Sequence, residues 1–183
     1  MSNRRGEIIK GILLAVGAVG LITVSVALPG LPAAFAPFFK NKRYTKQQVK
    51  RSLRKLEKNK LISVKYKDDK IELRITKGGR EKVLLYNLET LRIPSPKKWD
   101  GKFRIVIFDI PQQFKKNSSY FSKKLKDLGF YKLQKSVWAY PYPCEDEIDF
   151  LKEIYLVRPF VRMITAEEID VKQDLLKKFN ILF

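Results

Sequence analysis

FRIVIFDIP, residues 103–111, is the stretch that decides the fold of the second half of this chain. Apolar residues dominate it up to the carboxylate of Asp109, and Pro111 follows two residues later. A short apolar run that ends at a proline is typical of a buried β-strand. The sequence therefore predicts a strand over 103–109 that delivers one carboxylate to its carboxyl end.

Helix-like and strand-like segments alternate after this strand. Apolar residues recur at helical spacing in two segments, and shorter apolar runs mark three further strands. The predicted elements cover residues 103–109, 117–128, 130–134, 136–140, 145–154 and 161–166. Their βαββαβ order predicts a ferredoxin-like domain, which a terminal helix over 172–179 follows.

The charge of the chain indicates a polyanionic partner. The formal net charge is +19, and the sequence pI is about 10.0. Residues 1–99 hold 23 Lys and Arg against 7 Asp and Glu, whereas residues 100–183 hold 15 against 12. We therefore expect the amino-terminal half to bind the polyanion, which is nucleic acid or an anionic membrane surface.

The composition also excludes several kinds of chemistry. No histidine is present, and Cys144 is the only cysteine. Ser-His-Asp and Cys-His catalysis, histidine metal ligands, internal disulfides and cysteine-cluster zinc sites are therefore excluded. A single cysteine also suggests a reducing compartment, so we expect a cytoplasmic protein.

Residues 11–28, GILLAVGAVGLITVSVAL, contain no charged side chain. A membrane span needs about 20 apolar residues, so this run is at the lower limit of length. A Pro-rich connection ends the run, and the following domain needs a first helix. We therefore predict a buried helix over about 7–28, with a membrane anchor as the alternative.

A basic amphipathic segment follows this run. Residues 45–59, TKQQVKRSLRKLEKN, predict a helix that begins at Thr45 as N-cap and buries Val49, Leu53 and Leu56. Extended runs over 61–66 and 71–76 predict a hairpin with a charged tip. A last helix follows over 77–88.

This order of elements predicts a winged helix-turn-helix that binds double-stranded DNA. Lysines and arginines neutralise phosphates, and a glutamine or arginine can reach base edges in the major groove. The alternative is a solvated basic helix that enters no groove. The candidate DNA-binding residues are Lys46, Gln47, Lys50, Arg51 and Arg54 on the helix and Lys67 and Lys70 at the hairpin tip.

LRIPSPKKW, residues 91–99, has the composition of a linker because it contains two prolines and a basic pair. The predicted protein is therefore of the α+β class and has four parts. These are a winged helix-turn-helix domain over 1–90, a linker over 91–100, a ferredoxin-like dimerisation domain over 101–170 and a carboxyl-terminal helix over 171–183.

Three motifs of the second domain resemble the small ferredoxin-fold protein of the CRISPR adaptation complex: FRIVIFDIP, LKDLGF and LQKSVWAYP. With the basic domain in front, residues 40–170 resemble the phenylacetate-operon repressor family, which is also called PaaX-like. The resemblance implies a transcriptional repressor that joins a winged helix-turn-helix to a CRISPR-adaptation-nuclease-like module. No residue can be matched to the binding of that repressor's aryl-CoA effector.

Asp109 matches the aspartate that is the proposed metal ligand in the CRISPR-associated family. The resemblance implies that two copies of Asp109 hold Mg²⁺ across a dimer for phosphodiester hydrolysis. The structural alternative is an aspartate that accepts backbone N–H bonds of the turn that follows. Alternation places Asp109 on the face of Phe103 and Ile105, so we expect its carboxyl group to be partly covered.

We therefore expect a sequence-specific, dimeric DNA-binding regulator that requires no cofactor, and the sequence favours a regulator over an enzyme without deciding between them. One alternative is a Mg²⁺-dependent endonuclease in which Asp109 is both metal ligand and catalytic residue. The other is a membrane-tethered DNA-binding regulator anchored by residues 11–28.

Overall fold

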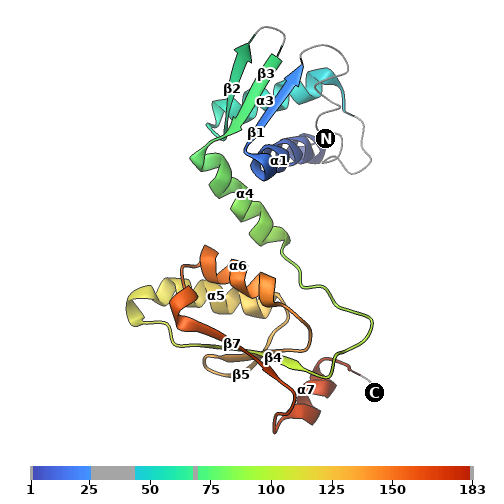
Figure 1. Cartoon of the computed structure of the whole chain (residues 1–183), viewed down its shortest axis with the longest axis vertical. Coiled ribbons are helices and arrows are strands. Elements are labelled where there is room, and N and C mark those ends of the chain that lie inside the picture. The colour runs from blue at the N-terminus through green and yellow to red at the C-terminus, as the bar shows by residue number, and fades with distance from the viewer. Residues whose placement is uncertain (1, 26–43, 68–69, 182–183) are drawn as a thin grey trace. The chain divides into compact units, whose positions relative to one another are not determined.

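The computed structural model describes residues 2–25, 44–67 and 70–181, and the chain divides into two compact units. The amino-terminal unit covers Met1–Glu89, and the carboxyl-terminal unit covers Thr90–Phe183. Each unit combines helices with an antiparallel sheet, which confirms the predicted α+β class (Figure 1).

The amino-terminal unit has one sheet, in which β3 is the central strand. Its described elements are α1 (Ser2–Val19), β1 (Leu21–Ser25), α3 (Lys46–Lys58), β2 (Ile62–Lys67), β3 (Lys70–Ile75) and α4 (Lys77–Thr90). The strands lie in the order β1-β3-β2. The predicted hairpin is confirmed, and its register runs from Ile62↔Ile75 to Lys67↔Lys70.

The apolar run over 11–28 is not one helix, so the predicted first helix over about 7–28 is wrong. α1 ends at Val19, Gly20 has a φ of 74°, and the chain continues as strand β1. Glycine adopts this positive φ without a side-chain clash, and the β-branched Ile22 and Thr23 favour a strand. Residues 26–28 lie outside the described residues. Among the described helices, none has the length and apolarity that a membrane crossing requires.

α3 begins at a capping box, which confirms the predicted N-cap. The side chain of Thr45 accepts the N–H of Gln48 at 3.2 Å, and the side chain of Gln48 accepts the N–H of Thr45 at 2.9 Å. Val49, Leu53 and Leu56 are buried in a core shared with α1 and the sheet. The predicted apolar stripe therefore fixes which side of α3 faces outward.

The carboxyl-terminal unit has a four-stranded antiparallel sheet with the order β5-β6-β4-β7. Its main elements are β4 (Phe103–Phe108), α5 (Lys115–Asp127), β5 (Tyr131–Gln134), β6 (Val137–Tyr140), α6 (Glu145–Ile154), β7 (Val161–Ala166) and α7 (Lys172–Lys178). These elements match the predicted order of strands and helices along the chain.

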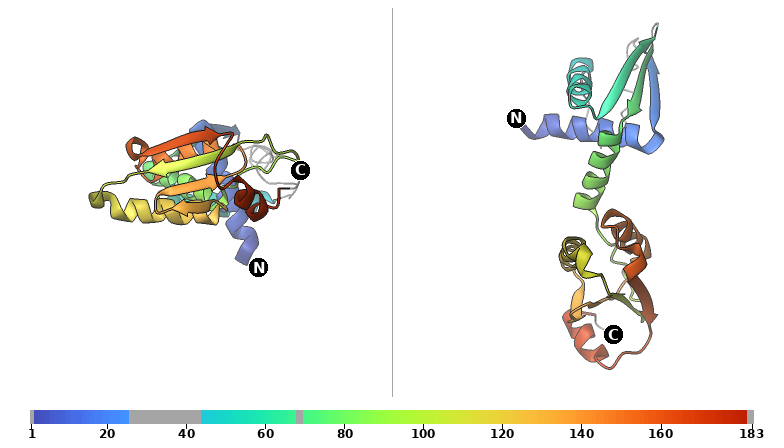
Figure 2. Two further views of the ribbon diagram at one scale, coloured as in Figure 1. Left: turned by 90° about the horizontal axis from the view of Figure 1, so that it is seen from below. Right: turned by 90° about the vertical axis from the view of Figure 1, so that its left-hand side faces the viewer.

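Helices cover both faces of this sheet, with α5 and α6 on one face and α7 on the other (Figure 1 and Figure 2). On one side, Phe108 packs edge-on against Phe121 of α5, with 5.3 Å between ring centroids. On the other side, Phe103 and Ile105 share a core with Leu175 of α7. Burial on two faces explains why the sequence of β4 is almost continuously apolar.

Candidate nucleic-acid interface

The outward side of α3 carries a row of cations. Gln47, Lys50, Arg51 and Arg54 are exposed, as predicted from the apolar stripe, whereas Lys46 is half-buried. Lys50, Arg51 and Arg54 take part in none of the ion pairs between described residues. Their charges are therefore available to an external polyanion.

The row is longer than the predicted set of contacts. Gln47, Arg51 and Arg54 follow one another at helical spacings of four and three, and the next position of this stripe is the exposed Lys58. The same spacing could have identified Lys58 from the sequence. Its addition extends the basic stripe to the carboxyl end of α3.

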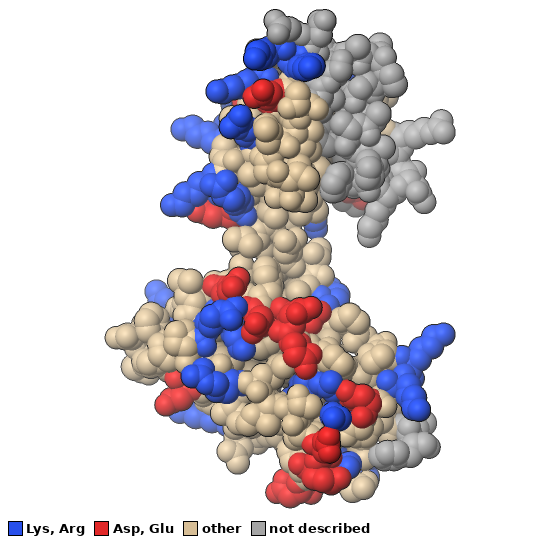
Figure 3. All heavy atoms as spheres, in the orientation of Figure 1, with Lys and Arg blue, Asp and Glu red and all other residues tan. Residues whose placement is uncertain are grey.

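The β2–β3 hairpin adds further cations. Lys67 and Lys70 are exposed and lie directly opposite each other in the strand register. Like charges at such positions repel each other, and a bound phosphate would relieve that repulsion. Lys65 is also exposed and was not among the predicted contacts. Figure 3 shows Lys and Arg side chains gathered over this hairpin, with few acidic atoms among them.

Asp109 lies just beyond the end of β4, and its side chain is exposed. The expectation that its carboxyl group is partly covered is wrong, because the strand ends at Phe108 and the alternation of faces ends with it. The backbone N–H of Asp109 donates to the carbonyl of Phe160 at 3.1 Å. Asp109 also borders a hollow of about 330 Å³, which Arg162 and Phe160 help to line.

The residues around Asp109 within one chain do not fit a Mg²⁺ site. The hollow is lined by one carboxylate and by the guanidinium-bearing Arg162, and a cation there opposes a second cation. Across the described residues, no group of three or more His, Cys, Asp or Glu side chains is placed to hold a metal ion. Proteins usually hold Mg²⁺ through one or two carboxylates, and the one carboxylate among the lining residues, that of Asp109, shares the hollow with a guanidinium.

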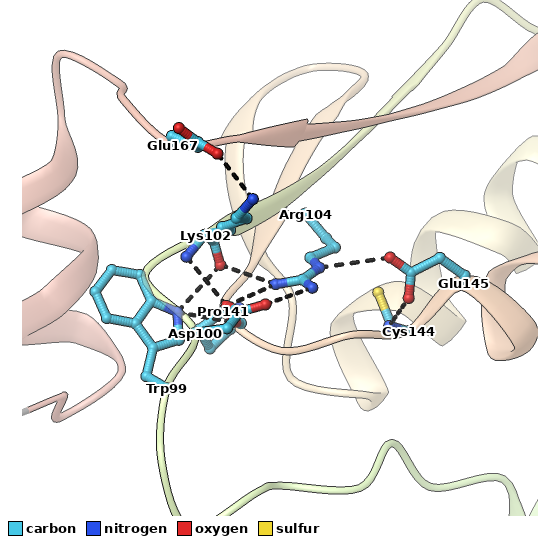
Figure 4. A network of polar contacts seen from close by, with 8 residues as sticks. All are labelled: Trp99, Asp100, Lys102, Arg104, Pro141, Cys144, Glu145 and Glu167. Carbon is cyan, nitrogen blue, oxygen red and sulfur yellow. Dashed lines mark hydrogen bonds and ion pairs between the residues drawn. The ribbon is translucent and has the colours of Figure 1, made fainter.

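A buried ion network around Arg104 was not predicted. The Arg104 side chain is 7% exposed and lies within β4. Its Nη2 contacts Oδ2 of Asp100 at 2.7 Å, and its Nη1 donates to Oδ1 of Asp100 at 2.9 Å. On its other side, Nε donates to Glu145 Oε1 at 3.5 Å (Figure 4). The hydrogen bond with Arg104 lowers the pKa of the Asp100 carboxyl, and the same bond raises the pKa of Arg104.

This network joins three segments of the carboxyl-terminal unit. The indole Nε1 of Trp99 donates to the carbonyls of Pro141 at 2.8 Å and Lys102 at 3.1 Å. Glu145 accepts the backbone N–H of Cys144 at 2.8 Å with its second oxygen. Burial raises the pKa of the Cys144 thiol to about 12, so this thiol is protonated at neutral pH. The network therefore stabilises the fold, and Cys144 is not a nucleophile.

The aromatic side chains of β6 also belong to the fold. Trp138 and Tyr140 are buried, and Tyr140 stacks on Phe130 with 4.7 Å between ring centroids. Neither ring is presented for base stacking. Among the described helices of this unit, α5 carries an exposed aromatic side chain, Tyr120, which is 60% exposed.

Comparison with known proteins identifies a family that part of the chain matches. Residues 96–176 match the PaaX protein central Cas2-like domain, and this range runs from before β4 to a point within α7 and includes Asp109 and Arg104. No curated protein showed significant similarity to the chain. Over residues 96–176 the chain is therefore PaaX-like, with a Cas2-like domain.

Proposed function

We propose that this chain is a transcriptional regulator that binds duplex DNA as a dimer and in a sequence-dependent way. The observation that carries the proposal is the row of exposed cations on α3, of which Lys50, Arg51 and Arg54 have no ion-pair partner among the described residues. The match to the central domain of PaaX proteins supports a regulator, because the PaaX family is a family of regulators.

The arrangement of the amino-terminal unit supports a winged helix-turn-helix. The described order places a basic helix before a two-stranded hairpin, and the sheet order β1-β3-β2 leaves the hairpin at one side of the sheet. In winged domains a helix enters the major groove while the hairpin contacts the flanking backbone. The order β5-β6-β4-β7 in the other unit likewise fits a ferredoxin-like fold.

In the proposed complex, α3 lies in the major groove. Lys50, Arg51 and Arg54 neutralise phosphates, and Gln47 near the start of the helix reaches a base edge. Gln48 is held in the capping box, so Gln47 is the adjacent amide that stays available. Lys67 and Lys70 contact the backbone beside the groove.

The test begins with selection of bound duplexes from a random-sequence pool, followed by fluorescence anisotropy with a selected duplex. Lys50→Ala/Arg51→Ala should weaken binding at least about tenfold and reduce the slope of log K against log salt by about 1.8. The control is Lys97→Ala/Lys98→Ala, which removes the same charge from an exposed pair outside the amino-terminal unit. Equal affinity losses in the two variants would contradict the proposal.

A separate measurement tests the proposed dimer. Light scattering of the complex should give two chains per selected duplex. The selected sequence should contain two half-sites about 10 base pairs apart, or a multiple of that distance. A single unrepeated site bound by one chain would contradict the dimer while leaving DNA binding by α3 intact.

A further inference from the structure

A second basic surface lies on α5, in the unit that the proposed DNA contacts do not use. α5 contains five lysines, and its one acidic residue is Asp127 at its end. Lys115, Lys116, Lys123 and Lys126 are exposed and join none of the ion pairs in the described part of the chain. Lys116, Tyr120, Lys123 and Lys126 follow at spacings of four and three, so they form one stripe.

Two lysines of α5 are unfavourably placed relative to the dipole of their own helix. Lys115 and Lys116 lie in the first turn, where the helix dipole favours anions and no acidic residue is present. α6 covers the same sheet face and follows the usual rule, with Glu145, Asp146 and Glu147 in its first turn. Figure 3 shows acidic side chains gathered over α6. The repulsion left on α5 favours an anionic partner from outside the chain.

An exposed aromatic ring lies within this stripe. Tyr120 is 60% exposed, and its ring stacks on Tyr155, with 6.5 Å between centroids and 22° between planes. The stacking holds the ring in place, so its outer side can pack against a sugar or base. The apolar side of α5, with Phe121 and Leu125 fully buried, is used in the core. That side is therefore not available for insertion into a lipid surface.

We infer that α5 is a second nucleic-acid contact surface, which binds the sugar-phosphate backbone of DNA through Lys116, Lys123 and Lys126, with Tyr120 packed between them. The charge complementarity to phosphate, the lysines in the first turn and the exposed ring within the row carry this inference. It assigns DNA contacts to the unit that matches the Cas2-like domain, in addition to those proposed for α3.

The test uses the full chain and anisotropy of a labelled random-sequence duplex of about 40 base pairs. Lys116→Gln/Lys123→Gln/Lys126→Gln should weaken binding at least about tenfold near 0.1 M salt and lower the salt slope by about 2.7. Lys97→Gln/Lys135→Gln/Lys177→Gln is the matched control, because it removes the same charge from exposed lysines of the same unit. Equal losses in the two triple variants would overturn the inference.

Two further arms separate this inference from the proposed function and from a membrane role. If Lys50→Ala/Arg51→Ala has no effect but the α5 triple variant binds DNA weakly, the proposal for α3 fails and the inference for α5 stands. If the α5 triple variant loses only its binding to phosphatidylserine vesicles, the inference is overturned in favour of a lipid surface.

Tyr120→Ala should lower DNA affinity, and Tyr120→Phe should restore it because the ring is kept.

Discussion

On α3, Lys50, Arg51 and Arg54 are exposed and unpaired among the described residues, whereas on β4 Arg104 is buried and bound to two carboxylates. Both regions carry cationic side chains, yet these cations have different partners. Arg104 is satisfied within its own unit and stabilises it. The cations of α3 add repulsion to a unit that holds 20 Lys and Arg against 7 Asp and Glu.

A unit that directs its cations outward must be held by uncharged contacts. In the amino-terminal unit, the Thr76 hydroxyl donates to the carbonyl of Lys60 at 2.6 Å and accepts the N–H of Gly79 at 3.0 Å. Gly79 lies against the backbone of Leu61, where an added Cβ would overlap the carbonyl oxygen. This close approach ties the start of α4 to the connection between α3 and β2.

The largest expected effect is on this close approach. Gly79→Ala should lower the free energy of unfolding of the amino-terminal unit by about 3 kcal/mol or more, because the Cβ would overlap backbone that cannot move cheaply. Both tryptophans, Trp99 and Trp138, lie in the other unit, so their fluorescence reports that unit alone. Circular dichroism follows the helices of both units, so Gly79→Ala should shift one component of its unfolding transition to milder conditions while the fluorescence transition stays unchanged.

Gly6 provides the matched control for that substitution. It lies within α1, and a Cβ added there would meet nothing within 4 Å. Gly6→Ala should therefore be neutral or stabilise by up to about 1 kcal/mol. Similar destabilisation by the two substitutions would contradict the role given to the contact with Leu61, because helix propensity favours alanine at both positions.

Loss of the buried cation should have the next largest effect. Arg104→Met should destabilise the carboxyl-terminal unit by about 2 kcal/mol, less than for a fully buried pair because Asp100 and Glu145 can be rehydrated. Tryptophan fluorescence in urea measures the change. Arg158→Met removes an arginine that is 51% exposed, and it should cost at most about 0.5 kcal/mol. Equal costs would mean that burial of Arg104 adds nothing.

A smaller effect should appear at acid pH. Arg104 lowers the pKa of Asp100 in the folded state, so the pair contributes stability above the unfolded pKa of about 3.9 and loses it as pH falls through the lower folded value. The free energy of unfolding of the wild type should therefore exceed that of Asp100→Asn by a constant amount above about pH 5, and this difference should disappear at lower pH. Parallel curves down to pH 2 would show that the charge of Asp100 is not involved.

The smallest expected effect is a difference between the two units in how salt changes their melting temperatures. Screening weakens the repulsion among the cations of the amino-terminal unit, so its melting temperature should rise modestly between about 0.02 and 0.3 M NaCl. The carboxyl-terminal unit holds 18 Lys and Arg against 12 Asp and Glu and should change less. Tryptophan fluorescence follows the carboxyl-terminal unit, and the component of the circular dichroism transition that fluorescence does not show follows the amino-terminal unit. Identical shifts of the two transitions would contradict the comparison.

Local patterns predicted most of the helices and strands, because periodicity and caps are properties of neighbouring residues. The capping box at Thr45 and the apolar stripe of α3 are clear examples. The prediction of one helix over about 7–28 was wrong, because continuous apolar composition does not distinguish a single helix from a helix that is followed by a strand. Gly20, followed by β-branched residues, was the signal that marks the division.

Contacts distant in sequence account for what could not be predicted. Asp100 lies only four residues before Arg104, but Glu145 is 41 residues away, so the sequence near β4 does not show that the guanidinium is buried between two carboxylates. The sequence places Gly79 at the start of a helix, but it does not show that the backbone of Leu61 leaves no room for a Cβ at this position. Asp109 was matched correctly to a strand end, while its exposure depends on where the strand stops.

The pairing of β1 with β3 has a consequence for how the amino-terminal unit folds. Residues 21–25 bind residues 70–74, so the exposed cations of α3 and β2 lie within one large chain loop that this pairing closes. Long loops close slowly compared with local helices and hairpins, so we expect docking of β1 to limit the folding rate. A nascent chain would then complete its cationic surface only after Ile75 has been synthesised and β1 has docked.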